Sequence, residues 1–197
     1  ITCRDWSSDV CSSDLSLTVE TDSWVEMPPM KVARANEGIA VVDDKIFVFG
    51  GLMSEKAGTD SCCEIFSMKE GKWIPETEVP RPMQDRRSNM GVAVIGKRIF
   101  AISGARKGHH TTVEVLDTQA NTWSTLSPIP TARNDPAVAV IDDRFIWTLG
   151  GNKEGRDLDV IEVFDAEKNE WFVPPIRLTS PNAGSCAIVS KHLIYLI

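Results

Sequence analysis

The sequence predicts an all-β fold assembled from one repeated unit. Three observations predict it: evenly spaced tryptophans, a recurring apolar strand before them, and a recurring pair of apolar runs that ends in glycine. The tryptophans lie 49, 50 and 48 residues apart, at Trp24, Trp73, Trp123 and Trp171. A repeat of about fifty residues is typical of a propeller blade.

A short strand ends seven residues before each of the last three tryptophans, within residues 63–66, 113–117 and 161–165. The residue two positions before each tryptophan is of a type that accepts a positive φ at little cost. Those residues are Asp22, Gly71, Asn121 and Asn169. We therefore expect a strand, a tight turn and a tryptophan-bearing strand to form one hairpin.

A second hairpin is predicted in the same phase of each repeat, within residues 40–51, 93–104, 139–151 and 187–197. Each copy has an apolar run, a two-residue polar turn and a second apolar run, which is the pattern of a short β-hairpin. The runs do not alternate cleanly between apolar and polar residues, so both faces of each sheet should be covered. Stacked neighbouring sheets would provide that cover.

Each unit has four elements: an arginine-led turn, a pair of strands that ends in Gly-Gly, a strand of the type Ile161–Asp165, and a tryptophan-bearing strand. Together they resemble the kelch repeat over residues 16–197. The sequence departs from the kelch pattern at Ser103, which replaces the first glycine of a pair, and at Phe66, Leu116 and Phe164, which replace a tyrosine. The resemblance implies a kelch β-propeller with radial four-stranded antiparallel blades, the first strand at the channel and the tryptophan strand outermost. A β-sandwich with coincidentally spaced tryptophans is the alternative.

The chain is expected to hold one propeller domain behind a leader. Residues 5–15 match the translation of a sequencing-library adapter, so residues 1–15 are predicted to be a non-native leader and residues 16–197 a fragment of one propeller domain. Complete blades are expected at about 34–77, 87–126 and 133–174, with half-blades at 16–27 and 184–197. The half-blades could close a four-bladed ring, but an arc cut from a larger ring is the favoured interpretation.

The repeated tryptophans and glycines are interpreted as structural. Trp73, Trp123 and Trp171 should be wedges between blades, with Trp24 as the first member of the set. The glycines should serve backbone geometry where a strand ends near its neighbour. They are Gly50, Gly51, Gly104, Gly150 and Gly151.

Composition and charge exclude several classes of function. Hydrophobic residues make up 42% and charged residues 25% of the chain, and the formal net charge is −7. The leader contributes −2, which leaves −5 and argues against general nucleic-acid binding. No run is long enough to span a membrane. The five cysteines show no metal or disulfide spacing, so a cytoplasmic location without metal or cofactor is expected.

An arginine motif recurs four residues before the first strand of each blade. Radial symmetry would place its three guanidinium groups in a ring around the channel mouth. Two interpretations are open: the arginines capture an acidic or phosphorylated peptide, or each pairs with an acid of a neighbouring blade, such as Glu64, Glu114 or Glu162, and ties the blades together. The non-repeating loops 53–60, 106–110 and 152–159 should carry specificity. The predicted partner-binding residues are Arg34, Asn36, Arg87, Asn89, Arg133, Asn134, Arg106, His109 and Arg156.

No catalytic motif is found. Copper oxidases on kelch propellers need two tyrosines, and Tyr195 is the only one in the chain. We predict a non-enzymatic protein-interaction module that is similar to the propeller of Kelch-like adaptors, which recognise substrates for cullin-RING ubiquitin ligases through attached BTB and BACK domains. An actin-associated cytoskeletal scaffold and a kelch-fold small-molecule enzyme, a sugar epimerase or oxidase, are the alternatives.

Overall fold

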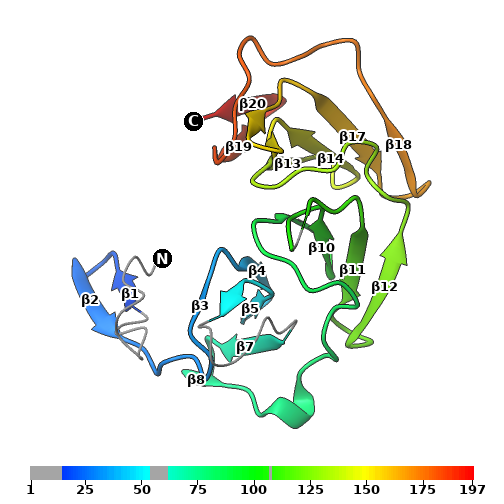
Figure 1. The fold of residues 1–197 in the computed structure, drawn as a ribbon. Coiled ribbons are helices and arrows are strands. Elements are labelled where there is room, and N and C mark those ends of the chain that lie inside the picture. Colours follow the sequence, from blue (N-terminus) through cyan, green and yellow to red (C-terminus); the bar gives the residue numbers. More distant parts are fainter. Residues whose placement is uncertain (1–14, 54–61, 107) are drawn as a thin grey trace.

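The computed structural model describes residues 15–53, 62–106 and 108–197, and these form β-strands with a single 3-10 turn at Glu76–Glu78. Three four-stranded antiparallel sheets stand side by side in an arc, flanked by a two-stranded hairpin at each end (Figure 1). The predicted all-β class and partial propeller architecture are confirmed.

Each sheet is one blade whose strands follow chain order from the inside outward. The first strands of neighbouring blades contact one another, and the tryptophan strands lie at the outer edges. The first blade contains β4 (Gly38–Val42), β5 (Lys45–Phe49), β7 (Cys63–Ser67) and β8 (Lys72–Trp73). The second contains β9 (Gly91–Ile95), β10 (Arg98–Ile102), β11 (Val113–Asp117) and β12 (Thr122–Leu126). The third contains β13 (Ala137–Ile141), β14 (Phe145–Leu149), β17 (Ile161–Asp165) and β18 (Glu170–Phe172).

The predicted turns adopt the backbone conformation that their residue types favour. The φ angles are 48° at Asp22, 64° at Gly71, 57° at Asn121 and 57° at Asn169. All four lie in the left-handed region, which glycine, asparagine and aspartate tolerate best. This local chemistry sets the register of each outer hairpin. Each tryptophan is therefore paired with an equivalent residue of the strand before it, and these residues are Leu17, Phe66, Leu116 and Phe164.

The hydrophobic cores lie between blades. One cluster joins Phe49 of the first blade with Ile99 of the second, and the next joins Phe100 of the second with Phe164 of the third. Phe49 and Phe100 are completely buried. Burial of each such ring stabilises the fold by about 2–3 kcal/mol. Each sheet therefore gains its core by packing on its neighbour.

The tryptophans occupy related but unequal sites. Trp123 packs edge-on against Phe49 of the preceding blade, with ring centroids 5.4 Å apart. Trp171 packs on the cluster between the second and third blades and donates its indole N–H to Ser127 O at 2.9 Å. Trp73 contacts Phe66 within its own blade. Trp24 is 64% exposed, and among the described strands its hairpin pairs with no other.

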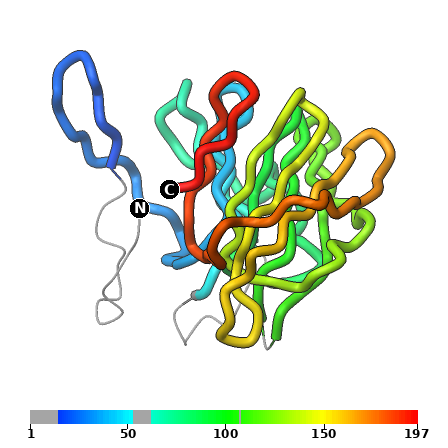
Figure 2. The backbone as a smooth tube through the Cα atoms, turned by 90° about the horizontal axis from the view of Figure 1, so that it is seen from above, coloured from blue at the N-terminus to red at the C-terminus, as the bar shows by residue number. Residues whose placement is uncertain are grey.

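The flanking hairpins differ in how they contact the blades. β19 (Ala187–Ser190) and β20 (Leu193–Leu196) pack on the third blade through β13. All residues of β1 (Leu15–Thr18) and β2 (Ser23–Glu26) are exposed. Within the described residues the two hairpins pair with themselves and not with each other, so a four-bladed ring is not closed (Figure 2).

Candidate interaction face

One arginine in each blade is fixed by the ends of that blade's own middle strands. In the first blade, Arg34 Nη1 donates to Gly50 O at 3.1 Å and Cys62 O at 3.0 Å, and Nη2 donates to Glu64 Oε1 at 2.6 Å. Arg34 also begins β3 (Arg34–Ala35), which pairs with β6 (Leu52–Met53). The guanidinium group therefore joins two strand ends and a carboxylate in one buried cluster.

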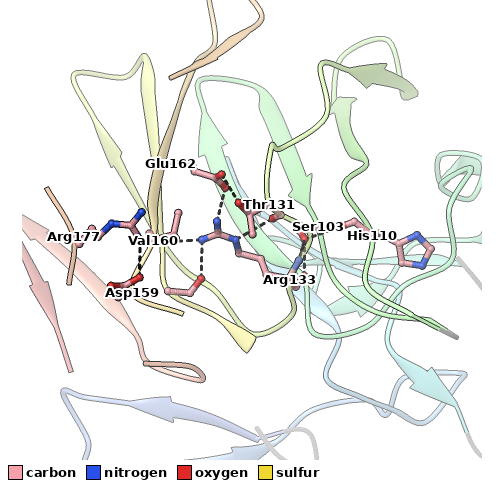
Figure 3. A network of polar contacts seen from close by, with 9 residues as sticks. Ser103, His110, Thr131, Arg133, Asp159, Val160, Glu162 and Arg177 are labelled. Carbon is pink, nitrogen blue, oxygen red and sulfur yellow. Dashed lines mark hydrogen bonds and ion pairs between the residues drawn. The ribbon is translucent and has the colours of Figure 1, made fainter. Parts of the chain in front are cut away.

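The same cluster recurs in the other complete blades. Arg133 donates to Gly150 O at 2.7 Å, to Val160 O at 3.2 Å and to the carboxylate of Glu162 (Figure 3). In the second blade the corresponding acceptors of Arg87 are Ser103 O, Thr112 O and Glu114. We call each of these sets an arginine clamp.

The clamps correct the expectation of an exposed guanidinium ring at the channel mouth. The side chains of Arg34, Arg87 and Arg133 are 0% exposed, so they offer no donor to a partner. Burial lowers the pKa of Arg87 and of Arg133, while the adjacent carboxylates oppose that shift. Arginine remains charged even so. The alternative interpretation, in which the arginines pair with Glu64, Glu114 and Glu162, names the correct acids. Each acid, however, belongs to the same blade as its arginine and not to the neighbouring blade.

Backbone hydrogen bonds tie each blade to the next at the same place. Gly51 N donates to Arg87 O at 2.9 Å, and Gly104 N donates to Arg133 O at 2.9 Å. A Cβ atom on Gly50 would lie 2.6 Å from Arg87 O, so a side chain there would push the blades apart. The arginine residue thus links its own blade through its side chain and the preceding blade through its carbonyl.

Four equivalent residues are linked in series, from blade to blade, by backbone hydrogen bonds. Asn89 N donates to Asn36 O at 2.9 Å, Asp135 N to Asn89 O at 2.8 Å, and Gly184 N to Asp135 O at 3.0 Å. All four residues have positive φ angles, between 50° and 74°. A hollow of about 210 Å³ lies against these four residues. Its lining residues are Asn36, Glu37, Asn89, Met90, Asp135, Pro136, Gly184 and Ser185.

Two of the predicted asparagines, Asn89 and Asn134, meet at Asp135, which was not among the predicted partner-binding residues. The Asp135 carboxylate accepts Asn89 Nδ2 at 2.6 Å and Asn134 Nδ2 at 2.9 Å, whereas Asn36 is exposed. Glu37 also lines the hollow, and no basic residue does. The signal for Asp135 was present in the sequence, because it occupies the repeat position of Asn36 and Asn89.

The loops after the glycine positions of the second and third blades meet across the blade boundary. His109 Nε2 accepts the backbone N–H of Glu154 at 2.8 Å. Glu154 lies in the turn of a small hairpin, β15 (Asn152–Lys153) and β16 (Arg156–Asp157), in which Lys153 is directly opposite Arg156. Of the first blade's loop, residues 54–60 lie outside the described part of the chain.

Of the predicted partner-binding arginines, the two in the loops remain accessible to a partner, whereas the three in the clamps are buried. Arg106 and Arg156 are exposed, as is Lys153, which the sequence prediction did not include. In the described parts of the loops, none of these three side chains has an ion-pair partner. We call Arg106, Lys153 and Arg156 the cationic loop face.

A second feature that sequence reasoning missed is a groove of about 430 Å³ beside the first blade. It lies between Val32, the start of β7 at Cys63, and the connector that contains Val79. Burial raises the pKa of the Cys63 thiol to about 12. The length of the connector between blades could have indicated this groove. Trp73 and Arg87 are 14 residues apart, whereas Trp123 and Arg133, in the next connector, are 10 residues apart.

A family model described as the KLHDC2/KLHL20/DRC7 Kelch-repeats domain matches residues 4–197. The chain belongs to the kelch-repeat family. Beta-scruin of Limulus polyphemus is 26% identical over 91% of this chain and 20% of its own length. Kelch-like protein terF of Aspergillus terreus is 27% identical over 89% of this chain and 40% of its own length. Kelch-like protein 38 of Rattus norvegicus is 23% identical over 91% of this chain and 31% of its own length.

The kelch-repeat chain thus spans between a fifth and two fifths of these relatives. The family and its Kelch-like members support a protein-interaction module. The described residues contain no helix with the length and apolar character needed to cross a bilayer, and no group of three or more metal-ligating side chains.

Proposed function

We propose that this kelch-repeat chain binds an acidic segment of a partner protein on the cationic loop face. The observation that carries the proposal is the pairing of Lys153 with Arg156 on one small hairpin. Like charges directly opposite each other destabilise a β-hairpin. An acidic side chain or a phosphate on a partner would lie between the two cations and remove that repulsion.

Neighbouring residues support the same site. The His109 contact with Glu154 joins the loop that contains Arg106 to the hairpin that carries Lys153 and Arg156. The loops do not repeat from blade to blade, unlike the arginine clamps below them. Exposed loops on a rigid scaffold commonly carry binding residues. The arginine clamps supply that scaffold.

The experiment compares a peptide rich in glutamate and phosphoserine with a matched peptide in which glutamine and serine replace them. We expect the wild-type chain to prefer the acidic peptide and to lose affinity as salt rises, because exposed charges are screened. Lys153→Glu with Arg156→Glu should weaken binding at least tenfold, which corresponds to about 1.4 kcal/mol.

Lys168→Glu is the matched control, because Lys168 lies in the turn between β17 and β18 at the opposite end of the blade. That variant makes the same kind of charge reversal away from the cationic loop face. Its affinity for the acidic peptide should equal that of the wild type. Weakening by Lys168→Glu of about half that of the double substitution, in proportion to the charge changed, would instead indicate a nonspecific effect of net charge and would refute the site.

At a finer level, we propose that the chain recognises substrates within an adaptor for a cullin-RING ubiquitin ligase. Its similarity to Kelch-like proteins supports this role, although the chain covers less than half of each relative. The test is the coding sequence around this chain and copurification of a cullin with the longer protein. A longer protein without a BTB domain that cosediments with actin filaments would replace the ligase role with a cytoskeletal one.

A further inference from the structure

The groove beside the first blade is bounded by an unusually long connector. This connector runs from β8 to β9, contains the 3-10 turn and arches outward from the blade (Figure 1). It has 14 residues between its tryptophan and its clamp arginine, against 10 in the next connector. Ile129 of that shorter connector is 1% exposed and donates its N–H to Thr111 O at 2.9 Å, so the chain there lies directly on the second blade. The extra length of the first connector therefore encloses the groove.

The groove has the size and the wall of a small-molecule site. Its volume of about 430 Å³ lies within the range of about 300–1,000 Å³ of such sites, which are concave and lined mainly by apolar side chains. Cys63 and Val79 line it and also pack in the hydrophobic cluster between the first two blades. Pro80 and Pro82 stand in the connector, where each proline ring fixes φ and limits movement of the wall. The groove can therefore receive an apolar body without first being rearranged.

The charged side chains that line the groove leave one cation uncompensated. Lys31 Nζ pairs with Glu76 Oε1 at 3.2 Å, and the Glu64 carboxylate is held by Arg34 in the first arginine clamp. Arg81 is exposed and has no ion-pair partner among the described residues. A guanidinium group binds a carboxylate through two parallel hydrogen bonds. The groove thus combines an apolar wall with a site for one anion.

We propose that this groove binds a small carboxylic acid, with its apolar body between the connector and β7 and its carboxylate on Arg81. A monoanion balances the charge of the site. A neutral molecule would leave Arg81 unpaired, and a dianion would bring a second negative charge close to Glu64 and Glu76. The groove and the cationic loop face share no residue, so this inference goes beyond the proposed function and does not depend on it.

The test measures by isothermal titration calorimetry how tightly the full chain binds octanoate and octanamide, a neutral molecule of the same length. We expect octanoate to bind about tenfold more tightly or better, a factor that corresponds to about 1.4 kcal/mol, because only its carboxylate pairs with Arg81. Butyrate should bind more weakly than octanoate, because it has less apolar surface for the groove to bury. Equal affinity for octanoate and octanamide, or no binding of octanoate at millimolar concentration, would overturn the proposal.

Variants and cysteine labelling locate the bound molecule. Arg81→Gln should lower the affinity for octanoate to that for octanamide and leave the affinity for octanamide unchanged. Lys69→Gln is the matched control, because it removes an exposed cation that does not line the groove, and both affinities should equal those of the wild type. Saturating octanoate should also slow the alkylation of Cys62, which lines the groove, but not that of Cys186, which does not.

Two results would place the bound molecule elsewhere and overturn the proposal: an Arg81→Gln variant that still prefers octanoate, or a rate of Cys62 alkylation that octanoate does not change. Displacement of octanoate by the peptide rich in glutamate and phosphoserine would assign the groove to a partner protein, and this too would overturn the assignment of a small molecule.

Discussion

Removal of one arginine clamp should destabilise the whole arc. In Arg87→Ala, the chain loses hydrogen bonds from the guanidinium group to Ser103 O at 3.1 Å and Thr112 O at 2.7 Å, and the ion pair with Glu114. The Glu114 side chain is 2% exposed, so its charge cannot reach water. The variant therefore leaves a buried carboxylate without its cation.

The expected cost follows from what remains around that carboxylate. Loss of one member of a buried ion pair destabilises a protein by about 3–5 kcal/mol. Glu114 keeps two backbone donors, Gln84 N at 2.7 Å and Asp85 N at 3.3 Å, so we expect the lower end, about 3 kcal/mol. For a chain of this size, that corresponds to a fall in Tm of about 6–12 °C.

Urea unfolding followed by circular dichroism measures this cost, with Arg106→Ala as the matched control. Arg106 is exposed, so its removal should change stability by less than about 0.5 kcal/mol. Arg87→Met combined with Glu114→Gln should be less destabilising than the sum of the single changes, by about 2 kcal/mol. A loss below about 1 kcal/mol in Arg87→Ala, or strict additivity in the double variant, would refute the clamp as a stabilising unit.

Three further predictions concern single side chains. Hydrogen bonds from Arg144 hold the pKa of the Asp165 carboxyl at about 2, below its usual value of 3.8. The stability that this carboxylate contributes is therefore present above pH 3.8 and is lost as the pH falls toward 2. Asp165→Asn should flatten that part of an acid unfolding curve. Cys63, whose pKa is raised to about 12, should react with iodoacetamide far more slowly than exposed Cys186 at about pH 8, which lies below the usual pKa of a thiol. Equal rates in peptide mapping would contradict its burial. Ser103→Ala should lower the free energy of unfolding in urea by about 1–3 kcal/mol, because the Ser103 hydroxyl donates a hydrogen bond to Arg133 O at 2.5 Å. Ser103→Gly should cost about 1 kcal/mol less than Ser103→Ala, because φ at this position is 58° and glycine adopts a positive φ without strain.

Much of the fold could be predicted because its determinants are local and repeated. Asn121 and Asn169 mark turns by their tolerance of positive φ, and the structure has φ of 57° at both. The apolar runs without alternation predicted sheets covered on both faces, and the cores do lie between blades. Trp24 shows the limit of this reasoning, because it matches Trp123 in the sequence repeat but is 64% exposed in the structure, whereas Trp123 packs against Phe49.

The orientation of the arginines could not be predicted by repetition alone. Repetition shows that Arg34, Arg87 and Arg133 occupy equivalent sites, and it says nothing about whether those sites face solvent. The decisive partners are backbone carbonyls, such as Gly50 O, which carry no signature in the sequence. These carbonyl acceptors lie at the ends of strands, which come close to the arginine only when the blade has formed. A repeated charged residue is therefore better evidence for a scaffold than for a binding site.

The same reasoning explains why the cationic loop face emerges from residues that differ between blades. Arg156 was selected from the sequence because its loop varies, but its significance depends on the register that sets it opposite Lys153. That register requires the turn at Glu154 and Gly155, both of which have positive φ. A hairpin that places two cations face to face is costly for the isolated chain. Such a cost, confined to a non-repeating loop and absent from the blades beneath it, is what a surface selected for an acidic partner would show.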